Sequence, residues 1–372
     1  MKKISIFLLS ILVLLTSCVP GLNNKDDELL QTEEQPTGQP SIVPTYKLSD
    51  EEYSVVLPYR TSKARGVTTH QMADNRLDID ELEQGLMRHS KEYFDPSQYY
   101  FEEGQYLDST TVYEWIDELN PKVKTNAEVD DYRENPRYLT HILEQNFLKR
   151  NEDKTVELVG MSIGLAMKSQ YRFQTEIGGP YYYEPITEKE MLAEGEKFAQ
   201  TILERIREID GLQNVPIMFA IYREEKQGSA VPGNFVAKTY VKEGDRKIND
   251  WGMIDEEYIL FPSSEAEEKY FDDAQIVNSF GKDIADFFPN YVGYIGEGFY
   301  VNGQLQKLTI EVPIEFNGKA EIVGFAQYTY GLVKDEFPNN YDIEIKITSS
   351  DRLEGYIYRE AGEQNPIVHM FN

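Results

Sequence analysis

The chain has 372 residues, 40% of them hydrophobic, and a net charge of −28 from 65 acidic and 37 basic residues. This length is enough for one large domain or two ordinary domains, and the apolar content is enough to bury a core. The acidic charge argues against a nucleic-acid partner and against electrostatic attachment to anionic lipid headgroups.

The N-terminus has the pattern of a bacterial export signal that ends at a cysteine. Lys2 and Lys3 precede an apolar stretch from Ile4 to Leu15, which is shorter than the roughly 20 residues that span a bilayer. The following "TSC" ends at Cys18, the only cysteine, so the chain has no intrachain disulfide. The segment resembles a lipobox. It predicts a signal peptide over 1–17 and a diacylglycerol on the Cys18 sulfur, with an ordinary secretory signal as the alternative.

Composition changes after the signal. Residues 18–50 are rich in Pro, Gly, Asn, Gln and acidic side chains, which predicts a flexible tether. Residues 51–155 are predicted to form a helix-rich N-terminal part. It begins with a strand over 52–60 and continues with helices over 80–94, 110–120 and 137–150. Asp78 is the predicted N-cap of the first of these helices, with Glu81 completing a capping box.

Residues 156–372 contain more strands. The expected strands cover 155–173, 215–224, 234–241, 292–316, 341–350 and 353–360, and the expected helices cover 187–209, 264–288 and 319–337. Asn302-Gly303 marks a hairpin turn. Each half has the order strand, helix, strand, strand, which predicts an internal duplication of 156–262 and 263–372. We therefore expect an α+β fold with mixed or antiparallel sheets and packed helices.

One sequence motif matches the nucleophile elbow of serine hydrolases. Residues 160–164 have the pattern G-x-S-x-G around Ser162. Apolar residues keep alternating through the required turn, and the only later histidine is His369. The pattern therefore favours one continuous strand over a catalytic turn.

Other candidate ligands do not form a recognisable constellation. His70, His89, His141 and His369 have none of the spacings of a zinc site, and we predict that His89 and His141 lie on helices as packing or surface residues. The series Asp74, Asp78, Asp80 lacks the glycine and terminal glutamate of a calcium loop, so capping is preferred. Glycines 293, 296, 298 and 303 lack the Gly-Lys-Ser/Thr of a phosphate loop and suggest tight strand packing. We predict no catalytic residue, metal or cofactor.

Tyrosine is abundant, with 26 residues and clusters at 99–100 and 181–183. Exposed tyrosines can stack on sugars or bind protein, although strand and core packing is the commoner role. Carboxylates are too numerous for any pair to be singled out as an acid/base couple.

Several long strings carry a resemblance to a known family. They are "LPYRTSKARG", "NRLDIDELEQGLMRHSKEYFDPSQYYFEEGQYL", "RYLTHILEQNFL", "GMSIGLAM", "NVPIMFAIYREE" and "VPGNFVA". Together they resemble the CamS-type sex-pheromone lipoproteins of Gram-positive bacteria over nearly the whole chain after the tether. The resemblance implies that the signal is trimmed to a conjugation-related heptapeptide, here Ile11 to Ser17. The aromatic residue and the alanine of the family's active peptides are missing from this stretch. No catalytic residue is implied.

These observations predict a lipoprotein held by Cys18 on the extracellular face of the cell membrane, with no nucleic-acid partner. The mature domain is expected to be a non-enzymatic module that binds an unknown extracellular ligand or protein. The alternative is a hydrolase associated with the cell envelope.

Overall fold

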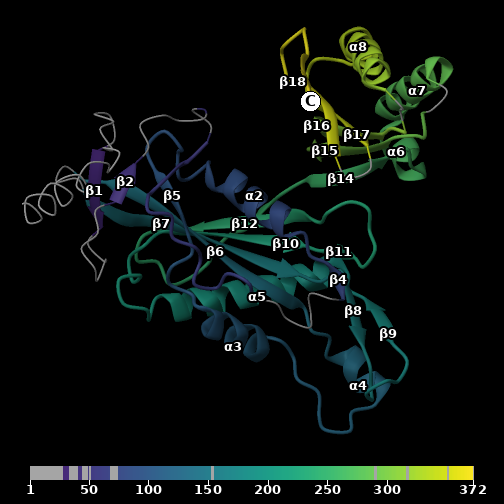
Figure 1. The fold of residues 1–372 in the computed structure, drawn as a ribbon. Coiled ribbons are helices and arrows are strands. Elements are labelled where there is room, and N and C mark those ends of the chain that lie inside the picture. The colour runs from purple at the N-terminus through teal and green to yellow at the C-terminus, as the bar shows by residue number, and fades with distance from the viewer. Residues whose placement is uncertain are drawn as a thin grey trace, which may run out of the picture.

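We describe the protein from a computed structural model, which covers residues 28–32, 41–43, 49, 52–67, 74–151, 155–288, 291–315, 318–349 and 352–371. These residues form two lobes, which we call the N-terminal lobe (52–253) and the C-terminal lobe (256–371) (Figure 1). In the described residues, no helix has the length and apolar character needed to cross a bilayer.

The N-terminal lobe is built on one large sheet. Its main path follows the order β13-β12-β10-β7-β6-β5-β3. These strands are β3 (Ser54–Val55), β5 (Tyr100–Glu103), β6 (Leu139–Arg150), β7 (Thr155–Met167), β10 (Ile217–Arg223), β12 (Asn234–Val241) and β13 (Gly252–Met253). The central pair, β7 and β10, is parallel, and the strands on either side of this pair, β6 and β12, run antiparallel to it.

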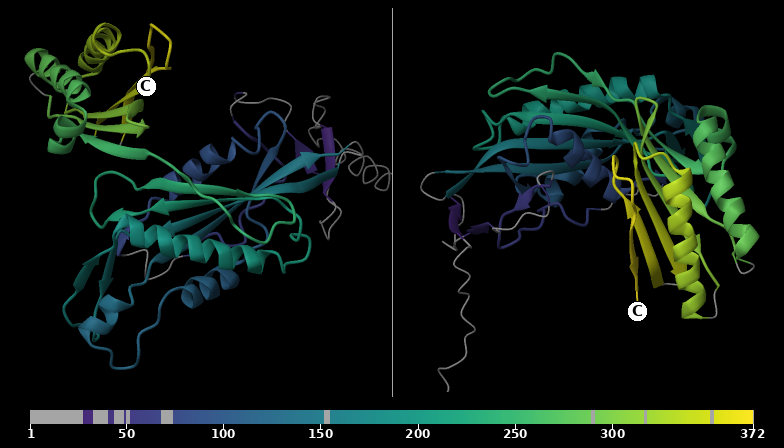
Figure 2. Two further views of the ribbon diagram at one scale, coloured as in Figure 1. Left: turned by 180° about the vertical axis from the view of Figure 1, so that it is seen from behind. Right: turned by 90° about the horizontal axis from the view of Figure 1, so that it is seen from above.

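Helices cover both faces of this sheet. On one face, α2 (Ile79–Ser90) packs Leu82 and Leu86 against aromatic residues that include Phe235. On the other face lie α3 (Ser109–Leu119) and α5 (Glu188–Ile206) with the largest core cluster of this lobe. The two further views show this layering (Figure 2). Because both faces are covered, β10 is buried along nearly its whole length and β7 is buried from Gly160 to Met167.

A smaller arm projects from the N-terminal lobe, away from the C-terminal lobe (Figure 1). It contains the two-stranded sheet of β8 (Gln170–Phe173) and β9 (Tyr182–Pro185), together with α4 (Val129–Glu134). A short pair of β4 (Asn75–Arg76) and β11 (Glu225–Lys226) lies near its base. The arm continues directly from the end of β7.

The C-terminal lobe has a six-stranded sheet with its helices on one face. The sheet order is β14-β15-β16-β17-β18-β19. Its strands are β14 (Glu256–Phe261), β15 (Ile295–Val301), β16 (Gln304–Pro313), β17 (Asp342–Ser349), β18 (Arg352–Arg359) and β19 (Ile367–Met370). The helices α6 (Ser264–Lys269), α7 (Phe271–Phe287) and α8 (Lys319–Glu336) enclose its core. Buried and partly exposed residues alternate along β17, as a one-sided sheet requires.

The two sheets share one order of pairings. In the N-terminal lobe, β6, β7, β10 and β12 are neighbours in that order, and α5 connects the parallel pair. In the C-terminal lobe, β15, β16, β17 and β18 repeat the order, and α8 connects the parallel pair. The α+β fold with mixed sheets is thus as predicted. The internal duplication remains a prediction, although the shared pairing order agrees with it. The repeated order begins at Leu139 in the first lobe, before residue 156, and at Ile295 in the second lobe, after residue 263.

The helix predicted over 137–150 is wrong. This segment is β6, a 12-residue strand that pairs with β7 across the predicted boundary at residue 155. Its apolar residues Leu139, Ile142 and Leu143 have helical spacing only because polar residues occupy other buried positions. Among them, the buried Glu144 accepts hydrogen bonds from the backbone N–H groups of residues 105–107 at 2.7–3.2 Å.

The segment predicted to be a tether also differs from expectation. Strands β1 (Glu28–Thr32) and β2 (Ser41–Val43) pair with each other, and β1 runs parallel to the start of β7. The start of β7 lies before its pairing with β10, so it offers free backbone groups to this neighbouring segment, and the tether remains a prediction. In the strand predicted over 52–60, only two residues form β3, whereas β5, β14 and β19 were not predicted.

Other local predictions are confirmed. The Asp78 side chain accepts from the Glu81 N–H at the start of α2, although Glu81 itself pairs with Arg88 instead of closing a capping box. Thr187 caps α5 with a full capping box. The turn at Asn302-Gly303 has positive φ at both residues. Strands β10, β12 and β15 to β17 lie within their predicted segments, as do helices α5 to α8, whereas β18 and α3 each begin one residue before theirs.

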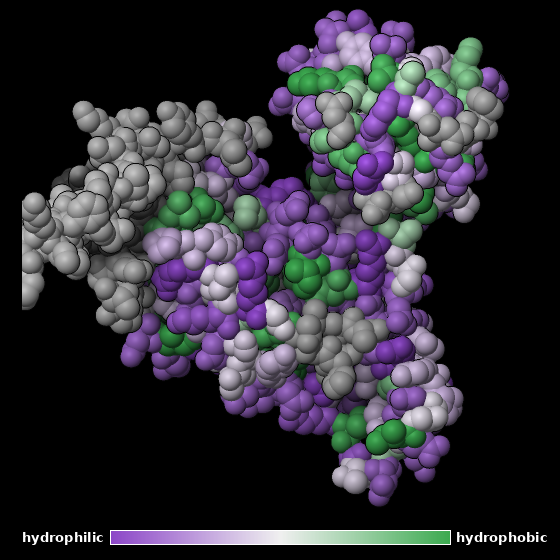
Figure 3. Space-filling view, viewed as in Figure 1, coloured by the Kyte–Doolittle hydropathy of each residue, from purple (hydrophilic) through white to green (hydrophobic). Residues whose placement is uncertain are grey.

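The lobes meet where α2 faces β14. Arg88 Nη2 lies 3.0 Å from Glu256 Oε2, and its guanidinium carbon lies 4.6 Å from the centre of the Phe299 ring. His89 Nε2 lies 3.2 Å from Glu256 Oε1. Burial disfavours the charge on Glu256, but His89 and Arg88 outweigh it and lower the pKa of this carboxyl. In the space-filling view the lobes are separate masses joined over a limited area (Figure 3).

Each lobe also contains a buried arginine that holds a connection between its helix and the second parallel strand. Arg207 donates to the carbonyls of Leu212 and Val215 at 2.8 and 2.7 Å, between α5 and β10. Arg359 donates to the carbonyls of Val333 and Phe337 at 2.9 and 3.0 Å, at the end of α8. Carbonyl oxygens near a helix end therefore find charged donors in both lobes.

Candidate functional site

The carboxyl ends of the parallel strands in the N-terminal lobe hold a buried charged network. Lys168 directly follows β7, and Glu224 directly follows β10. Their backbones are fixed by the strand pattern itself, because Glu224 N donates to Met167 O at 2.8 Å. In sheets with parallel strands, this edge is the usual place for a functional site.

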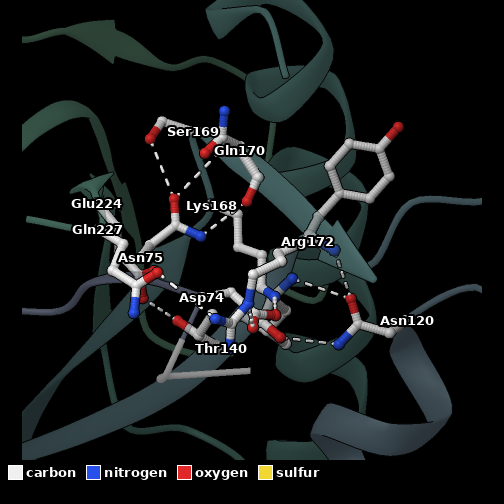
Figure 4. A network of polar contacts seen from close by, with 12 residues as sticks. Asp74, Asn75, Asn120, Thr140, Lys168, Ser169, Gln170, Arg172, Glu224 and Gln227 are labelled. Atoms are coloured by element: carbon white, nitrogen blue, oxygen red, sulfur yellow. Dashed lines mark hydrogen bonds and ion pairs between the residues drawn. The ribbon is translucent and has the colours of Figure 1, made fainter. Parts of the chain in front are cut away.

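Asp74 is the anionic centre of the network (Figure 4). Its Oδ2 lies 2.6 Å from Lys168 Nζ, and its Oδ1 lies 2.9 Å from Arg172 Nε. The Lys168 side chain is completely buried, whereas 16% of the Arg172 side chain is exposed. Burial lowers the pKa of the Lys168 ammonium, although Asp74 opposes this effect. The network therefore has a sealed end and an open end.

Glu224 lies at the sealed end. Burial raises the pKa of its carboxyl to about 7, against the opposing effects of Thr140 and Lys168. The Thr140 hydroxyl contacts both Glu224 Oε1 and, at 3.0 Å, Ala166 O. A hydroxyl has one proton, so it cannot donate to both oxygens. A protonated Glu224 resolves this, because it donates to Thr140 while Thr140 donates to the carbonyl.

Side-chain amides hold the surrounding loops. Asn75 Nδ2 donates to Gln170 O at 2.7 Å, and Asn75 Oδ1 accepts from Ser169 Oγ and Gln170 N at 3.1 Å each. Asn120 joins the end of α3 to the start of β6, because its Oδ1 accepts from the N–H of Leu139 at 2.9 Å. Figure 4 shows these amides on opposite sides of the charged residues. The network is consequently held from several elements.

This arrangement is suited to holding a surface side chain in position, not to acid/base chemistry on a substrate. Glu224, whose pKa burial raises to about 7, is completely enclosed. A general acid or base must come within hydrogen-bond reach of the atom it serves. Arg172 and Gln227, whose Nη1 and Oε1 lie 3.5 Å apart, are the members that reach toward solvent.

Ser162 lies inside β7, as predicted, and has no elbow geometry. It pairs with Met218 and Gln145 in the sheet and is fully buried. Its Oγ lies 2.7 Å from Ser90 Oγ, so its hydroxyl contacts a helix residue. A nucleophile elbow needs an exposed hydroxyl at a strand-to-helix turn, and both conditions are absent here.

The structure does not bring the described histidines together. His89 is on α2, as predicted, and faces Glu256. His141 was predicted on a helix and is instead on β6, where burial lowers the pKa of its imidazole to about 4. His369 is on β19 against the edge of Phe371. His70 and Cys18 lie outside the described residues.

Two further sequence patterns receive a structural explanation. Asp78 caps a helix and Asp74 forms ion pairs, and in the described segments no group of three or more His, Cys, Asp or Glu side chains is arranged to hold a metal ion. A Cβ on Gly298 would lie 2.9 Å from carbons of Phe261 and Tyr300. The glycine-rich run therefore permits close packing of strands and aromatic rings.

Sequence reasoning missed Lys168, Arg172 and Glu224. The available signal was their position, since Lys168 and Glu224 each end an apolar run that reads as a buried strand. Asp74 lies almost 100 residues before Lys168, and no local spacing indicates that the two meet. The two roles expected for tyrosine both occur in the 181–183 cluster. Tyr182 packs in the arm, whereas Tyr181 and Tyr183 are about half exposed.

Comparisons with other proteins define the class. The family described as CamS sex pheromone cAM373 precursor matches residues 59–365. A crystal structure of a sex pheromone precursor from Lactobacillus salivarius subsp. salivarius is 30% identical, with a TM-score of 0.80 over 89% of this chain and 99% of that chain. The C-terminal domain of the sex pheromone staph-cAM373 precursor from Staphylococcus aureus is 28% identical, with a TM-score of 0.64 over 79% of this chain and 96% of that chain. No curated protein matches.

This chain therefore belongs to the CamS sex pheromone cAM373 precursor family. The resemblance inferred from its sequence strings is confirmed.

Proposed function

We propose that the chain is the precursor of a short apolar peptide and that its remainder is a lipid-anchored module on the extracellular face of the cell membrane. The observation that carries this proposal is the family match over residues 59–365. The signal pattern of residues 1–18 supports it, because an apolar stretch ending at a sole cysteine suits both export and acylation. Two acyl chains on Cys18 give stable anchoring, which one chain does not.

Lipid attachment is tested by metabolic labelling with a fatty acid that can be detected on gels. The wild-type protein is expected to be labelled and to remain with the membrane. Cys18→Ala should lose the label and accumulate as precursor or shed protein, and Ser17→Ala, which keeps a small residue before the cysteine, serves as the matched control. Labelling of Cys18→Ala would contradict the anchoring proposal.

The peptide is tested separately. Ile11 to Ser17 is expected in the culture medium, where mass spectrometry identifies it by its sequence. Synthetic peptide of this sequence should induce mating only weakly in responders tuned to the family's usual peptide, because the missing aromatic side chain leaves a receptor pocket unfilled. Absence of the peptide from the medium would remove the signalling role and leave export and anchoring.

The mature domain is proposed to bind a ligand and not to hydrolyse one. The enclosed Glu224 and the buried Ser162 support this choice over an envelope hydrolase. A fluorophosphonate probe should leave the purified domain unlabelled. Stoichiometric labelling that disappears in Ser162→Ala would instead favour the hydrolase.

A further inference from the structure

The arm formed by β8, β9 and α4 has two different faces. On its inner face, Phe173 stacks on Tyr132, Tyr171 and Tyr182 with ring centres 4.9–5.4 Å apart. These four rings form a continuous aromatic cluster that joins the main core. The inner tyrosines are thus accounted for by packing.

The outer face of the arm carries aromatic rings that packing does not require. Tyr183 follows Tyr182 in β9 and therefore points to the opposite side of the two-stranded sheet. Tyr183 is 49% exposed, and Tyr181, just before the strand, is 51% exposed. We call Tyr181, Tyr183 and Arg172 the outer arm face.

Arg172 lies between the two exposed tyrosines. It is the register partner of Tyr183, and its guanidinium carbon lies 4.3 Å from the centre of the Tyr181 ring. Its Nε is held by Asp74, which is held in turn by the buried Lys168. The charged network therefore fixes the direction of a surface guanidinium, and a side chain fixed before binding loses less entropy when a ligand arrives.

The chemistry of this face points to a class of ligand. Tyrosine rings pack against the apolar faces of sugar rings, and their hydroxyls, with Gln227, can pair with sugar hydroxyls. Asp74 engages Nε of the Arg172 guanidinium and Gln227 Oε1 lies 3.5 Å from Nη1, so the remaining N–H groups can pair with a carboxylate. A densely charged polyanion would be repelled by a chain with a net charge of −28. A largely neutral glycan with isolated carboxylates meets all three conditions.

We propose that the outer arm face binds a glycan chain that carries isolated carboxylates, with the sugar rings on Tyr181 and Tyr183 and a carboxylate on Arg172. The source of the glycan rests on the proposed extracellular location, where cell-wall glycan is within reach. The binding geometry itself rests on the described residues alone.

The test measures binding of soluble peptidoglycan fragments to the mature chain, residues 18–372 with Cys18→Ser, by calorimetric titration. Wild type should bind, and Tyr181→Ala and Tyr183→Ala should each weaken the affinity by about tenfold or more. Arg172→Lys keeps the positive charge but cannot donate two parallel hydrogen bonds to one carboxylate. This variant should therefore discriminate less between fragments with free and amidated carboxylates. Tyr113→Ala removes a tyrosine of α3 with 42% exposure and is the matched control, with unchanged affinity.

Thermal unfolding of each variant separates lost binding from lost structure, since Tyr181 and Tyr183 are half exposed and their removal should leave the midpoint nearly unchanged. The proposal would be overturned if the wild-type protein did not bind the fragments, or if Tyr181→Ala and Tyr183→Ala bound them as tightly as wild type. Binding of a polyphosphate polymer in place of the fragments would overturn it as well.

Lipid labelling of Cys18 reports independently on the location of the protein. Failed labelling together with intact glycan binding would therefore reject the anchoring proposal and retain the glycan site.

Discussion

The two sheets of this protein share an order of strands but not an environment. In the N-terminal lobe, helices cover both faces, and β10 and the second part of β7, from Gly160 to Met167, are buried almost throughout. In the C-terminal lobe, helices cover one face, and exposure alternates along β17. A charged group at the strand ends is therefore sealed in one lobe and close to water in the other, which changes both its pKa and its contribution to stability.

Two glutamates illustrate this difference. Glu224 follows β10 and is enclosed, so burial raises the pKa of its carboxyl to about 7. Glu354 lies in β18, beside the end of β17, and its hydrogen bond from Lys319 is the main cause of a lowered pKa. Lys319 and Arg352, which cover Glu354, are themselves 62% and 72% exposed. The same residue type thus favours its neutral form in one lobe and its charged form in the other.

The largest expected effect comes from removing the cation at the sealed end. Lys168→Met should lower the free energy of unfolding by about 3 kcal/mol, because Asp74 loses a buried partner and keeps only Arg172. Lys319→Met in the C-terminal lobe is the matched control and should lower stability less, since Lys319 is 62% exposed and the buried Glu354 keeps Arg352 and Ser349 as partners. Denaturant unfolding measures both, and equal losses would remove the distinction between the lobes.

A pH series should separate the two carboxyl groups by sign. The pKa of Glu224 is raised on folding, so its contribution is fully present below the unfolded pKa and is lost as pH rises toward about 7. Glu224→Gln should cancel this loss and gain roughly 2–3 kcal/mol over wild type near pH 8, because one pKa unit corresponds to about 1.4 kcal/mol.

The lowered pKa of Glu354 gives the opposite trend, with stability lost as pH falls through its folded pKa. Glu354→Gln should therefore be less stable than wild type at neutral pH and approach it in acid. Unfolding at several pH values checks both variants, and parallel curves for wild type and Glu224→Gln would contradict the assignment.

A smaller effect is expected at the contact between the lobes. Glu256→Gln removes the ion pair with Arg88 and should cost about 1–2 kcal/mol, since Arg88 is one-third exposed. Small-angle scattering should show a larger radius of gyration. Glu257→Gln changes contacts with Lys269 and Tyr270 that both lie within the C-terminal lobe, so it should leave the radius unchanged. Because the pKa of Glu256 is lowered, wild-type protein should show the same expansion as pH falls through that pKa.

The smallest expected effect uses the open side of α8. A Cβ on Gly331 meets nothing within 4 Å, so Gly331→Ala should raise stability by up to about 1 kcal/mol through helix propensity. In α5, a Cβ on Gly195 would lie 2.9 Å from Ile221 Cδ1, and Gly195→Ala should lose that gain. Thermal unfolding of the two variants compares an open helix face with a covered one.

The same difference explains which predictions from sequence succeeded. Alternating patterns in β16, β17 and β18 were read correctly because one face of their sheet is open to solvent. Strand β6 is buried on both sides and includes polar residues held by partners far along the chain, so its period of two is obscured. Caps such as Asp78 and Thr187 were found because their evidence lies within four residues.

The site was beyond sequence reasoning for a related reason. Asp74 and Lys168 are 94 positions apart, and their contact depends on how the end of β7 meets the segment before α2. Exposed tyrosines were recognised as candidates, but only the alternation of Tyr182 and Tyr183 in β9 shows which face each ring takes. The spacing of residues in a motif shows neither which distant residues meet nor which face of a sheet a side chain takes.

The buried arginines have a consequence for how such a chain can change over time. Arg207 and Arg359 hold the connections between helix and strand with side-chain hydrogen bonds to several carbonyls. A connection held in this way has side-chain support in addition to its backbone turns, which between α5 and β10 include Gly211 at a φ of 86°. Insertions and deletions between α5 and β10, or between α8 and β17, can therefore accumulate in relatives while the parallel pairs keep their register. In an alignment of family members, we expect loops of variable length to lie next to a conserved arginine.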